Sequence, residues 1–378
     1  MTPVTDDLDR LADFLGDART RSAVVIVDAV VESNGYGERV RAALLRDVVV
    51  STHVVEPGEP SAAAVDLAAD AVRAAGRGAA VVAVGGGSVL DIAKLASSVA
   101  TAGDPVGVYA LGARRLPARH VLVAIPTTSG TGSEATRTCI FSDSANRKVW
   151  AWGDELLPDL VVLDPQATVT LPATITAATG LDAFVHAVEA ASGQRRDAES
   201  VKAASQAIAL VLTSLPAAVR DGTDLDARAA MQRAAHLAGN AIDRSGTGVA
   251  HAIGHALGTL AHVPHGAAVA VGLDAALAWN VDAAHDRYVT VADAAGVPVE
   301  GLAERYETLL ADVAFDNVAT AIGTIGSDAG RIATTMGAEE NLPMLDNNAS
   351  PPAPVDRHHL AERTLQRWTT WCEHGGRR

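Results

Sequence analysis

The segment "VVAVGGGSVLDIAKLASSVA", residues 81–100, decides the fold class of the first half of the chain. It begins as an unbroken apolar run, passes through three glycines at 85–87 and continues with apolar residues at helical spacing. This pattern predicts a buried strand, a tight turn and a helix with Ser88 as its N-cap. Glycines let a ligand approach the backbone, and the first turn of a helix presents unpaired N–H groups to an anion. The turn therefore suits a pyrophosphate, although it lacks GxGxxG spacing and a plain turn is an equal alternative on local grounds.

Similar apolar runs lie on both sides of this segment and alternate with amphipathic stretches. They are AVVIVD at 23–28, VVVSTHVV at 48–55, HVLVAIP at 120–126 and DLVVLDP at 159–165. Continuous β-branched runs separated by helices predict a parallel sheet that is buried on both faces. After Pro172 such runs largely cease, and Ala-rich segments with apolar residues three and four apart follow. We therefore expect an α/β domain over residues 1–168 and an all-α domain over residues 169–378.

A second polar loop, IPTTSGTGSEAT at 125–136, follows another predicted strand. Its hydroxyl groups and two glycines suit a polar ligand at the carboxyl ends of the strands, where open α/β sheets bind ligands. A solvated loop is the alternative interpretation. Because two loops of this character would meet at the same sheet edge, each strengthens the prediction of a binding site there.

Histidines are concentrated in GVAHAIGHALGTLAHVPHG, residues 248–266, among small and apolar residues. His251 and His255 are four residues apart, the spacing that places two side chains on one helix face. The same spacing separates Asp182 from His186. A carboxylate and several imidazoles suit a divalent metal such as Fe(II) or Zn(II), and a shared metal would offset the cost of burying imidazoles. A lone histidine more often packs in the core, and we assign that structural role to His262.

Composition narrows the classes of function. The chain has 378 residues, 48% of them hydrophobic, and 30 Lys and Arg against 45 Asp and Glu, for a formal charge of −15. No basic block is present, so we expect no nucleic-acid partner. The acidic N-terminus lacks the features of a signal peptide, no apolar run is expected to span a bilayer, and the two cysteines form no metal or redox motif. These features predict a cytoplasmic protein without a membrane partner.

Four motifs in this order, GGGSVLDIAK, IPTTSGTGSEAT, GLDAFVHAVE and HAIGHALG followed by HVPHG, resemble those of the iron-dependent (group III) alcohol dehydrogenase family. This family lies within a superfamily that also includes dehydroquinate synthase, and the resemblance covers about residues 20–290. It implies an N-terminal dinucleotide-binding α/β domain and a helical metal-binding domain. It also implies NAD(H)-dependent hydride transfer between a small primary alcohol and its aldehyde, and assembly as a homodimer or larger homo-oligomer.

The resemblance implies roles for individual residues. The family's metal ligands correspond to Asp182, His186, His251 and His265, with Fe(II) the first choice and Zn(II) the alternative. His255 corresponds to a residue considered for proton relay. The cofactor-binding positions correspond to Asp28, Gly86, Gly87, Ser88, Asp91, Thr127, Thr128, Thr131 and Lys148. A carboxylate at position 28 can accept from a ribose 2′-hydroxyl and repels a 2′-phosphate, which favours NAD over NADP.

Two departures and three alternatives accompany the resemblance. The family's additional strand before residues 23–28 is not expected, because the preceding residues have a helical pattern, and that sheet edge is then open or covered by a partner. Thr138 stands where the family often has asparagine.

A dehydroquinate-synthase-like lyase or cyclase is one alternative function, although residues 171–290 hold few cations for a phosphorylated sugar. A metal-independent maleylacetate-type reductase is disfavoured by the complete ligand set. A non-enzymatic binding protein is the third alternative, and in such a protein all these motifs would have lost their function.

Overall fold

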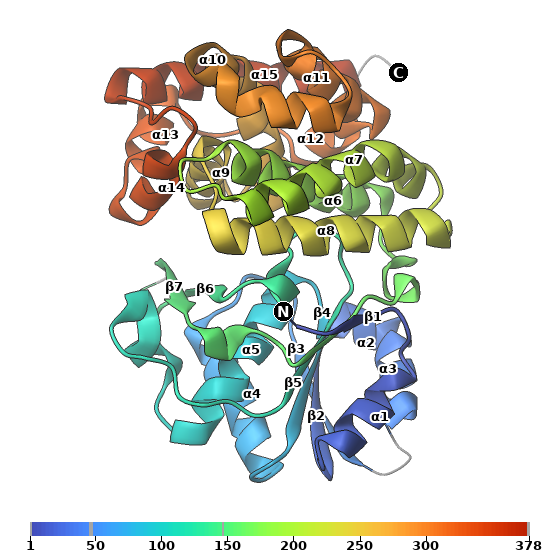
Figure 1. The fold of residues 1–378 in the computed structure, drawn as a ribbon. Helices are drawn as coiled ribbons and strands as arrows, with labels where there is room; N and C mark the ends of the chain where they lie inside the picture. Colours follow the sequence, from blue (N-terminus) through green and yellow to red (C-terminus); the bar gives the residue numbers. More distant parts are fainter. Residues whose placement is uncertain (1, 45–47, 146, 376–378) are drawn as a thin grey trace. The chain divides into compact units, whose positions relative to one another are not determined.

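The computed structural model describes residues 2–44, 48–145 and 147–375, and the chain divides into two compact units (Figure 1). The first unit holds the residues up to Thr128 and Gly132–Thr170. The second holds Ser129–Thr131 and all residues from Leu171 onward. The predicted fold class is confirmed, because the first unit is built on a parallel sheet with helices and the second is helical. Three residues of the hydroxyl-rich loop thus belong to the helical unit.

The first unit contains a six-stranded parallel sheet in the order β1-β8-β5-β4-β2-β3 and an antiparallel hairpin, β6–β7, within the described residues. Its elements are β1 (Val4–Thr5), α1 (Arg10–Asp17), β2 (Ser22–Asp28), α2 (Ala29–Ser33), α3 (Tyr36–Leu44), β3 (Val49–Val55), α4 (Ala62–Ala74), β4 (Ala80–Gly85), α5 (Gly87–Ala102), β5 (Leu122–Pro126), β6 (Thr138–Ser142), β7 (Lys148–Trp152) and β8 (Leu160–Val162). Strands β4 and β5 are buried along their whole length, as continuous apolar runs predict for a sheet covered on both faces.

The N-terminal region corrects one prediction. Residues before β2 include the expected helix α1, but Val4 and Thr5 also form the strand β1, which pairs in parallel with β8. The predicted absence of an additional strand was therefore wrong. A strand of two residues has too few positions for an alternating pattern, so sequence periodicity could not indicate it. Strand β1 covers the β8 side of the sheet, and β3 forms the opposite edge.

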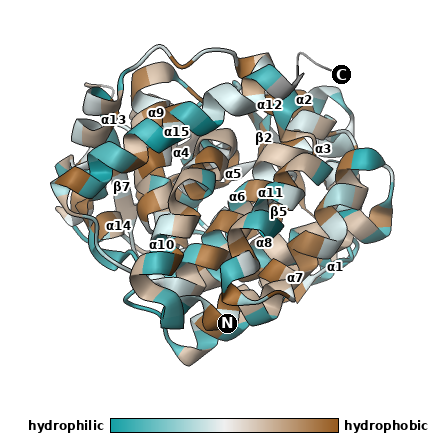
Figure 2. Cartoon of the chain, turned by 90° about the horizontal axis from the view of Figure 1, so that it is seen from above, coloured by the Kyte–Doolittle hydropathy of each residue, from teal (hydrophilic) through white to brown (hydrophobic). Residues whose placement is uncertain are grey.

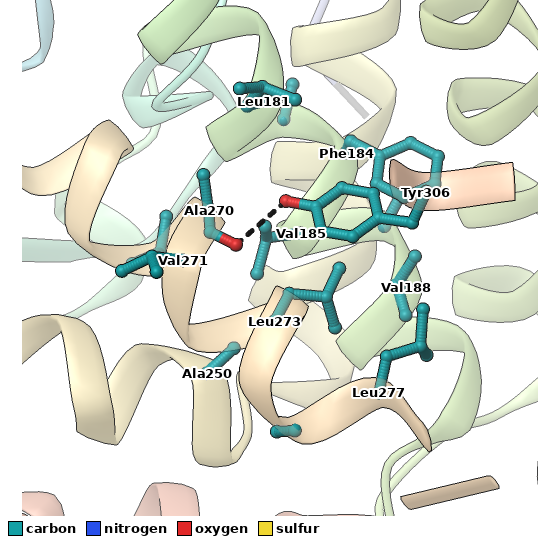
Figure 3. Packing of buried hydrophobic residues seen from close by; sticks show 14 of the residues in the cluster. Leu181, Phe184, Val185, Val188, Ala250, Ala270, Val271, Leu273, Leu277 and Tyr306 are labelled. Carbon is teal, nitrogen blue, oxygen red and sulfur yellow. Dashed lines mark hydrogen bonds between the residues drawn. The ribbon is translucent and has the colours of Figure 1, made fainter. Parts of the chain in front are cut away.

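The second unit is a bundle of helices within the described part of the chain. Its α-helices are α6 (Ala173–Ser192), α7 (Ala198–Arg220), α8 (Leu225–Ser245), α9 (Val249–Ala261), α10 (His265–Ala295), α11 (Leu302–Asp312), α12 (Phe315–Ile322), α13 (Ala329–Met336), α14 (Leu342–Asn347) and α15 (Pro354–Gly375). Helix α6 packs against α7, α8 and α10 and is buried on almost every face. In the core, the Phe184 ring stacks on Tyr306 at 5.3 Å, and the Tyr306 hydroxyl donates to the Ala270 carbonyl at 3.0 Å (Figure 3). These contacts join α6, α10 and α11.

Helices α7 and α10 correct the prediction that no segment is long and apolar enough to span a bilayer, because both meet that criterion by length and composition. Core helices of globular proteins meet it as well, and the apolar windows of α7 and α10 are 39% and 67% buried within the unit. Length and composition alone therefore assign neither helix to a membrane. Helix α15, by contrast, carries hydrophilic and hydrophobic residues together (Figure 2). Its side chains at Leu360, Thr364 and Trp368 are buried at helical spacing.

Candidate metal and nucleotide sites

The candidate nucleotide site lies at the carboxyl edge of the sheet in the first unit. Strands β2, β4 and β5 pair in parallel, with Val27 beside Val84 and Gly85 beside Pro126, so Asp28, Gly86 and Thr127 come to the same edge. Asp28 is the N-cap of α2, and its Oδ1 accepts from the Val31 N–H at 2.8 Å. The Thr127 side chain is buried, and its N–H donates to the Gly85 carbonyl at 3.0 Å. The sheet register thus brings three of the predicted cofactor positions, at the ends of three strands, to one edge.

The glycine turn starts helix α5 earlier than predicted. Gly86 is the N-cap, and its carbonyl accepts from the Leu90 N–H at 3.0 Å, so the prediction of Ser88 as N-cap was wrong. Gly87 and Ser88 lie in the first turn instead, where backbone N–H groups lack helical partners. A Cβ atom on Gly86 would lie 3.2 Å from Thr128 Cγ2. Glycine therefore lets the hydroxyl-rich loop approach the helix start, and the turn retains the shape of an anion site.

Asp91 and Lys94, one turn apart on α5, hold the hydroxyl-rich loop and the β6–β7 hairpin. The buried Lys94 Nζ donates to the carbonyls of Ser133 at 2.7 Å and Thr138 at 3.1 Å. Asp91 accepts from the Ser133 hydroxyl through Oδ1 and from the Ile140 N–H through Oδ2 at 2.9 Å. Both carboxylate oxygens of Asp91 are therefore already engaged by the protein, and a direct contact of Asp91 with a cofactor stays a prediction.

The other predicted cofactor positions belong to different elements of the chain. Thr131 belongs to the helical unit, whereas Thr128 belongs to the first unit. Lys148, at the start of β7, forms an ion pair with Glu59, with 2.7 Å between Nζ and Oε1. Thr138, at the start of β6, pairs with Trp152 across the hairpin. A contact of Lys148 with a cofactor would require its ammonium group to leave or share this ion pair, and that role stays a prediction.

The candidate metal site lies within the helical unit. Asp182 and His186 on α6, His251 on α9 and His265 at the start of α10 each offer a ligand atom, and these atoms lie within 4.8 Å of one another. Asp182 Oδ1 is 3.7 Å from His186 Nε2, 3.8 Å from His251 Nε2 and 3.7 Å from His265 Nε2. Ligand atoms about 2.1 Å from a tetrahedral ion are about 3.4 Å apart. The four side chains therefore already converge to nearly the spacing that a small divalent ion requires.

Unsatisfied polar atoms support a metal here. Within residues 2–44, 48–145 and 147–375, Asp182 Oδ1 and His251 Nε2 are buried without a hydrogen-bond partner, which is costly unless another group pairs with them. Burial, with repulsion from His186, lowers the pKa of His251 well below its usual value, so this imidazole is neutral and has a lone pair to donate. The side chain of His265 is 40% exposed, so the cluster is accessible from one side. One carboxylate and three imidazoles fit Fe(II) or Zn(II).

The remaining two histidines of the motif have separate surroundings. His255 is half-buried outside the four-residue cluster, its ring 5.8 Å from that of His265, and its Nδ1 lies 3.1 Å from Asn341 Oδ1. His262 ends α9 in a left-handed conformation with φ of 53°, and its side chain is exposed. The prediction that His262 packs in the core was therefore wrong, and its left-handed backbone ends α9 instead.

Glu189, a residue that the sequence motifs did not single out, lies on α6 one turn after His186. Its carboxylate accepts from the N–H groups of Gly248 at 2.8 Å and Ala250 at 2.7 Å, and Oε2 lies 2.6 Å from His251 Nδ1. Burial raises the pKa of Glu189 to about 7, although these two N–H groups oppose the shift. The spacing of three residues from His186 could have indicated that Glu189 faces the same region.

Asn347 and Asn348, which precede a segment with prolines at 351, 352 and 354, were also missed. Asn348 Oδ1 accepts from the Val249 N–H at 3.2 Å, and the Asn347 side-chain amide donates to the carbonyls of Ser245 and Thr247 at 2.8 Å. Both asparagines are buried. This segment, which has the composition of a solvated loop, therefore anchors the end of α8 and the start of α9.

Comparison with known proteins agrees with this geometry. Residues 4–165 match the family described as iron-containing alcohol dehydrogenase, and residues 176–326 match the C-terminal part of the Fe-containing alcohol dehydrogenase family. The chain belongs to the iron-containing alcohol dehydrogenase family. The resemblance inferred from the four motifs is confirmed, and the protein is an alcohol dehydrogenase.

Individual relatives of this dehydrogenase cover most of its length. It is 32% identical to an NAD-dependent methanol dehydrogenase of Bacillus methanolicus over 87% of this chain and 86% of that protein. It is 36% identical to the probable alcohol dehydrogenase EutG of Salmonella typhimurium over 70% of this chain and 67% of that protein. A solved 1,3-propanediol oxidoreductase matches with a TM-score of 0.84 and 26% identity, over 96% of this chain and 97% of the other.

Two glycines of the dehydrogenase pack directly on the helix that carries Asp182. A Cβ atom on Gly266 would lie 2.3 Å from the Ala178 carbonyl oxygen, and one on Gly130 would lie 2.4 Å from the Thr179 carbonyl oxygen. Both contacts are with the turn of α6 that precedes Asp182. The absence of a side chain at these positions thus sets how closely α10 and the 129–131 segment approach α6.

We expect Gly266→Ala to lower the free energy of unfolding by about 1–3 kcal/mol and to weaken metal binding, because the new methyl group pushes α10 away from α6 beside His265. Thermal unfolding and the metal content of the purified protein measure the two effects. Gly326→Ala is the control, since a Cβ atom there meets no atom within 4 Å. Unchanged metal content in the Gly266 variant would contradict the prediction.

We expect Asp28→Ser to raise the ratio of kcat/KM for NADP to that for NAD by about tenfold or more, because a like charge near a phosphate is removed. Serine can still accept from the Val31 N–H, so the N-cap of α2 is preserved. Asp224→Ser makes the same change at the N-cap of α8 and should leave the ratio unaltered. An unaltered ratio in the Asp28 variant would remove this carboxylate from cofactor selection.

Proposed function

We propose that this alcohol dehydrogenase is NAD(H)-dependent and metal-activated, and that it interconverts a small primary alcohol and its aldehyde. Fe(II) is the preferred metal, with Zn(II) as the alternative. The convergence of four ligand atoms within 4.8 Å, from three helices, carries the proposal. The names of the relatives support the substrate class, since they include an NAD-dependent methanol dehydrogenase and a 1-propanol dehydrogenase.

In this proposal each unit has one task. Asp182, His186, His251 and His265 hold the metal. The α/β domain, proposed for residues 1–168, binds NAD(H) at its glycine turn, which lies in the first unit. The proposed contacts of the cofactor are Asp28, Gly86, Gly87, Ser88, Asp91, Thr127, Thr128, Thr131 and Lys148, of which Thr131 lies in the helical unit. The proposal includes a homo-oligomer, as the family resemblance implies, and a cytoplasmic location, as the sequence features predict.

When bound, the metal supplies Lewis acidity and the nicotinamide supplies or accepts a hydride. The chain itself supplies orientation and a path for the proton. The Asn341 amide donates to the Thr335 carbonyl at 2.8 Å, which turns its oxygen toward His255 Nδ1 at 3.1 Å. Nδ1 then carries the proton of the neutral ring, and Nε2 can accept a proton from an alcohol, directly or through water. Imidazole is suited to this exchange near neutral pH.

Net consumption of NADH and its dependence on metal distinguish the alternative functions. A maleylacetate-type reductase works without a metal, and the complete set of four ligands argues against it. A dehydroquinate-synthase-like enzyme would return the hydride in each cycle and show no net consumption of NADH. It would also need cations for a phosphorylated substrate, and several arginines in residues 171–290 are engaged elsewhere, such as Arg244 with Asp197 and Arg228 with Thr176.

The test is to purify the protein without oxygen, measure bound iron and zinc, and follow NADH oxidation with short aldehydes before and after chelation. We expect about one metal per chain and turnover that chelation abolishes and Fe(II) or Zn(II) restores. Turnover in a metal-free protein would overturn the metal assignment. A metal-loaded protein without net NADH oxidation by any aldehyde would favour the lyase or cyclase.

A further inference from the structure

We propose that Glu189 is a positioning residue that fixes the tautomer of His251, so that the Nε2 lone pair points toward Asp182 Oδ1. The proposal deepens the proposed function and rests on it, because it assumes that His251 is a metal ligand. Glu189 itself lies outside the cluster of four ligand atoms.

The contacts of Glu189 carry the inference about where the His251 proton lies. The Glu189 carboxylate is buried and receives two backbone N–H groups, those of Gly248 on Oε2 and Ala250 on Oε1. The short distance of 2.6 Å between Oε2 and His251 Nδ1 places a third donor on the same group. The two backbone N–H donors favour the ionised form of Glu189, which only accepts hydrogen bonds, so Nδ1 carries the proton and Nε2 keeps its lone pair. That Nε2 atom is 3.8 Å from Asp182 Oδ1.

His186 provides an internal contrast. Its Nδ1 is also buried, but no hydrogen-bond partner for it exists in the part of the chain that the structure describes. The rings of His186 and His251 stack with centroids 4.6 Å apart. Glu189 therefore orients one buried imidazole directly and restricts the other through ring contact. In metal sites such outer partners typically change metal affinity by about 10- to 100-fold.

A variant at Asn348 distinguishes the orientation of His251 by Glu189 from the support that Glu189 gives to helix α9. Glu189 satisfies two N–H groups at the start of α9, and Asn348 Oδ1 satisfies a third, that of Val249. No contact joins Asn348 to His251 among the hydrogen bonds of the described residues. Asn348→Ala therefore weakens the same helix start without removing the group that orients the imidazole.

The experiment compares Glu189→Gln with Asn348→Ala in competition titrations of the metal-free proteins with Zn(II) and a chromophoric chelator. The neutral amide has one acceptor atom for three donors, and whichever way it turns, its NH2 group opposes a backbone N–H. We expect the affinity of the Glu189 variant for Zn(II) to fall about 10- to 100-fold, and that of the Asn348 variant to change much less.

A second measurement reads the tautomer itself. Nitrogen-15 NMR of metal-free protein labelled at histidine, with His251 assigned from a His251→Gln variant, should show wild-type His251 protonated at Nδ1. In Glu189→Gln the Nε2-protonated form should gain population. Wild-type affinity together with an unchanged tautomer in Glu189→Gln would overturn the proposal.

Two further outcomes remain informative. If Glu189→Gln does not fold, a wild-type His251 protonated at Nε2 would still overturn the proposal, and one protonated at Nδ1 would support it. If wild-type protein binds no metal, the proposed function fails, whereas the tautomer measurement continues to test the Glu189 contact separately.

Discussion

An Asp182→Asn variant is expected to lose at least about 10³-fold in kcat/KM with any aldehyde substrate. Asp182 Oδ1 lies within 3.8 Å of the Nε2 atoms of His186, His251 and His265, so it is the common neighbour of the three imidazoles. Asparagine has nearly the same shape, but it removes the only negative charge of the ligand set. The fold should therefore persist while a divalent cation is held weakly. Steady-state rates with added Fe(II) or Zn(II), together with metal content, measure the effect.

Asp274→Asn is the matched control for this change. Asp274 is a buried carboxylate of the same helical unit, and it accepts from Arg367 at 2.7 Å and from the Trp371 indole at 2.9 Å. Its loss should reduce stability, because a buried ion pair is broken, but it should leave metal content unchanged. Full metal loading and full turnover in Asp182→Asn would exclude Asp182 as a ligand.

A Lys94→Met variant is expected to lose about 3–5 kcal/mol of unfolding free energy and to bind NAD(H) more weakly, with KM raised about tenfold or more. Lys94 is fully buried, and its Nζ donates to the carbonyls of Ser133 and Thr138 and lies 3.4 Å from the Thr136 hydroxyl. Methionine fills a similar volume but removes the charged donor that these oxygens share. The hydroxyl-rich loop and the start of β6 would then lose their anchor on α5.

Urea unfolding and the dependence of the rate on NADH concentration measure the two effects. Lys202→Met on α7 is the control, because Lys202 is exposed in the helical unit, outside the nucleotide-binding unit. Metal content should stay at the wild-type level in both variants, since the four ligand side chains lie in the helical unit. Wild-type stability and KM in Lys94→Met would show that this loop is held by other contacts.

Local patterns allowed much of the fold to be predicted. The apolar runs and the three glycines that follow β4 predicted the parallel sheet and the start of α5 to within two residues, because burial and backbone freedom act over a few neighbouring residues. The spacing of four between Asp182 and His186 likewise predicted that they share a helix face, and the structure places both beside His251 and His265. Which of these residues hold metal or cofactor stays a prediction.

By itself, the sequence determined the fold class, the family and the residue types available for a metal and a dinucleotide, because these depend on short-range periodicity and on motifs of neighbouring residues. Only the tertiary structure decided which distant groups become partners. Glu189 meets His251 across 62 residues, and Asn348 meets Val249 across 99, because packing of separate helices brings their hydrogen-bonding groups together. Such pairs have no local signature, since their distances depend on helix packing and glycine contacts such as that of Gly266 with α6.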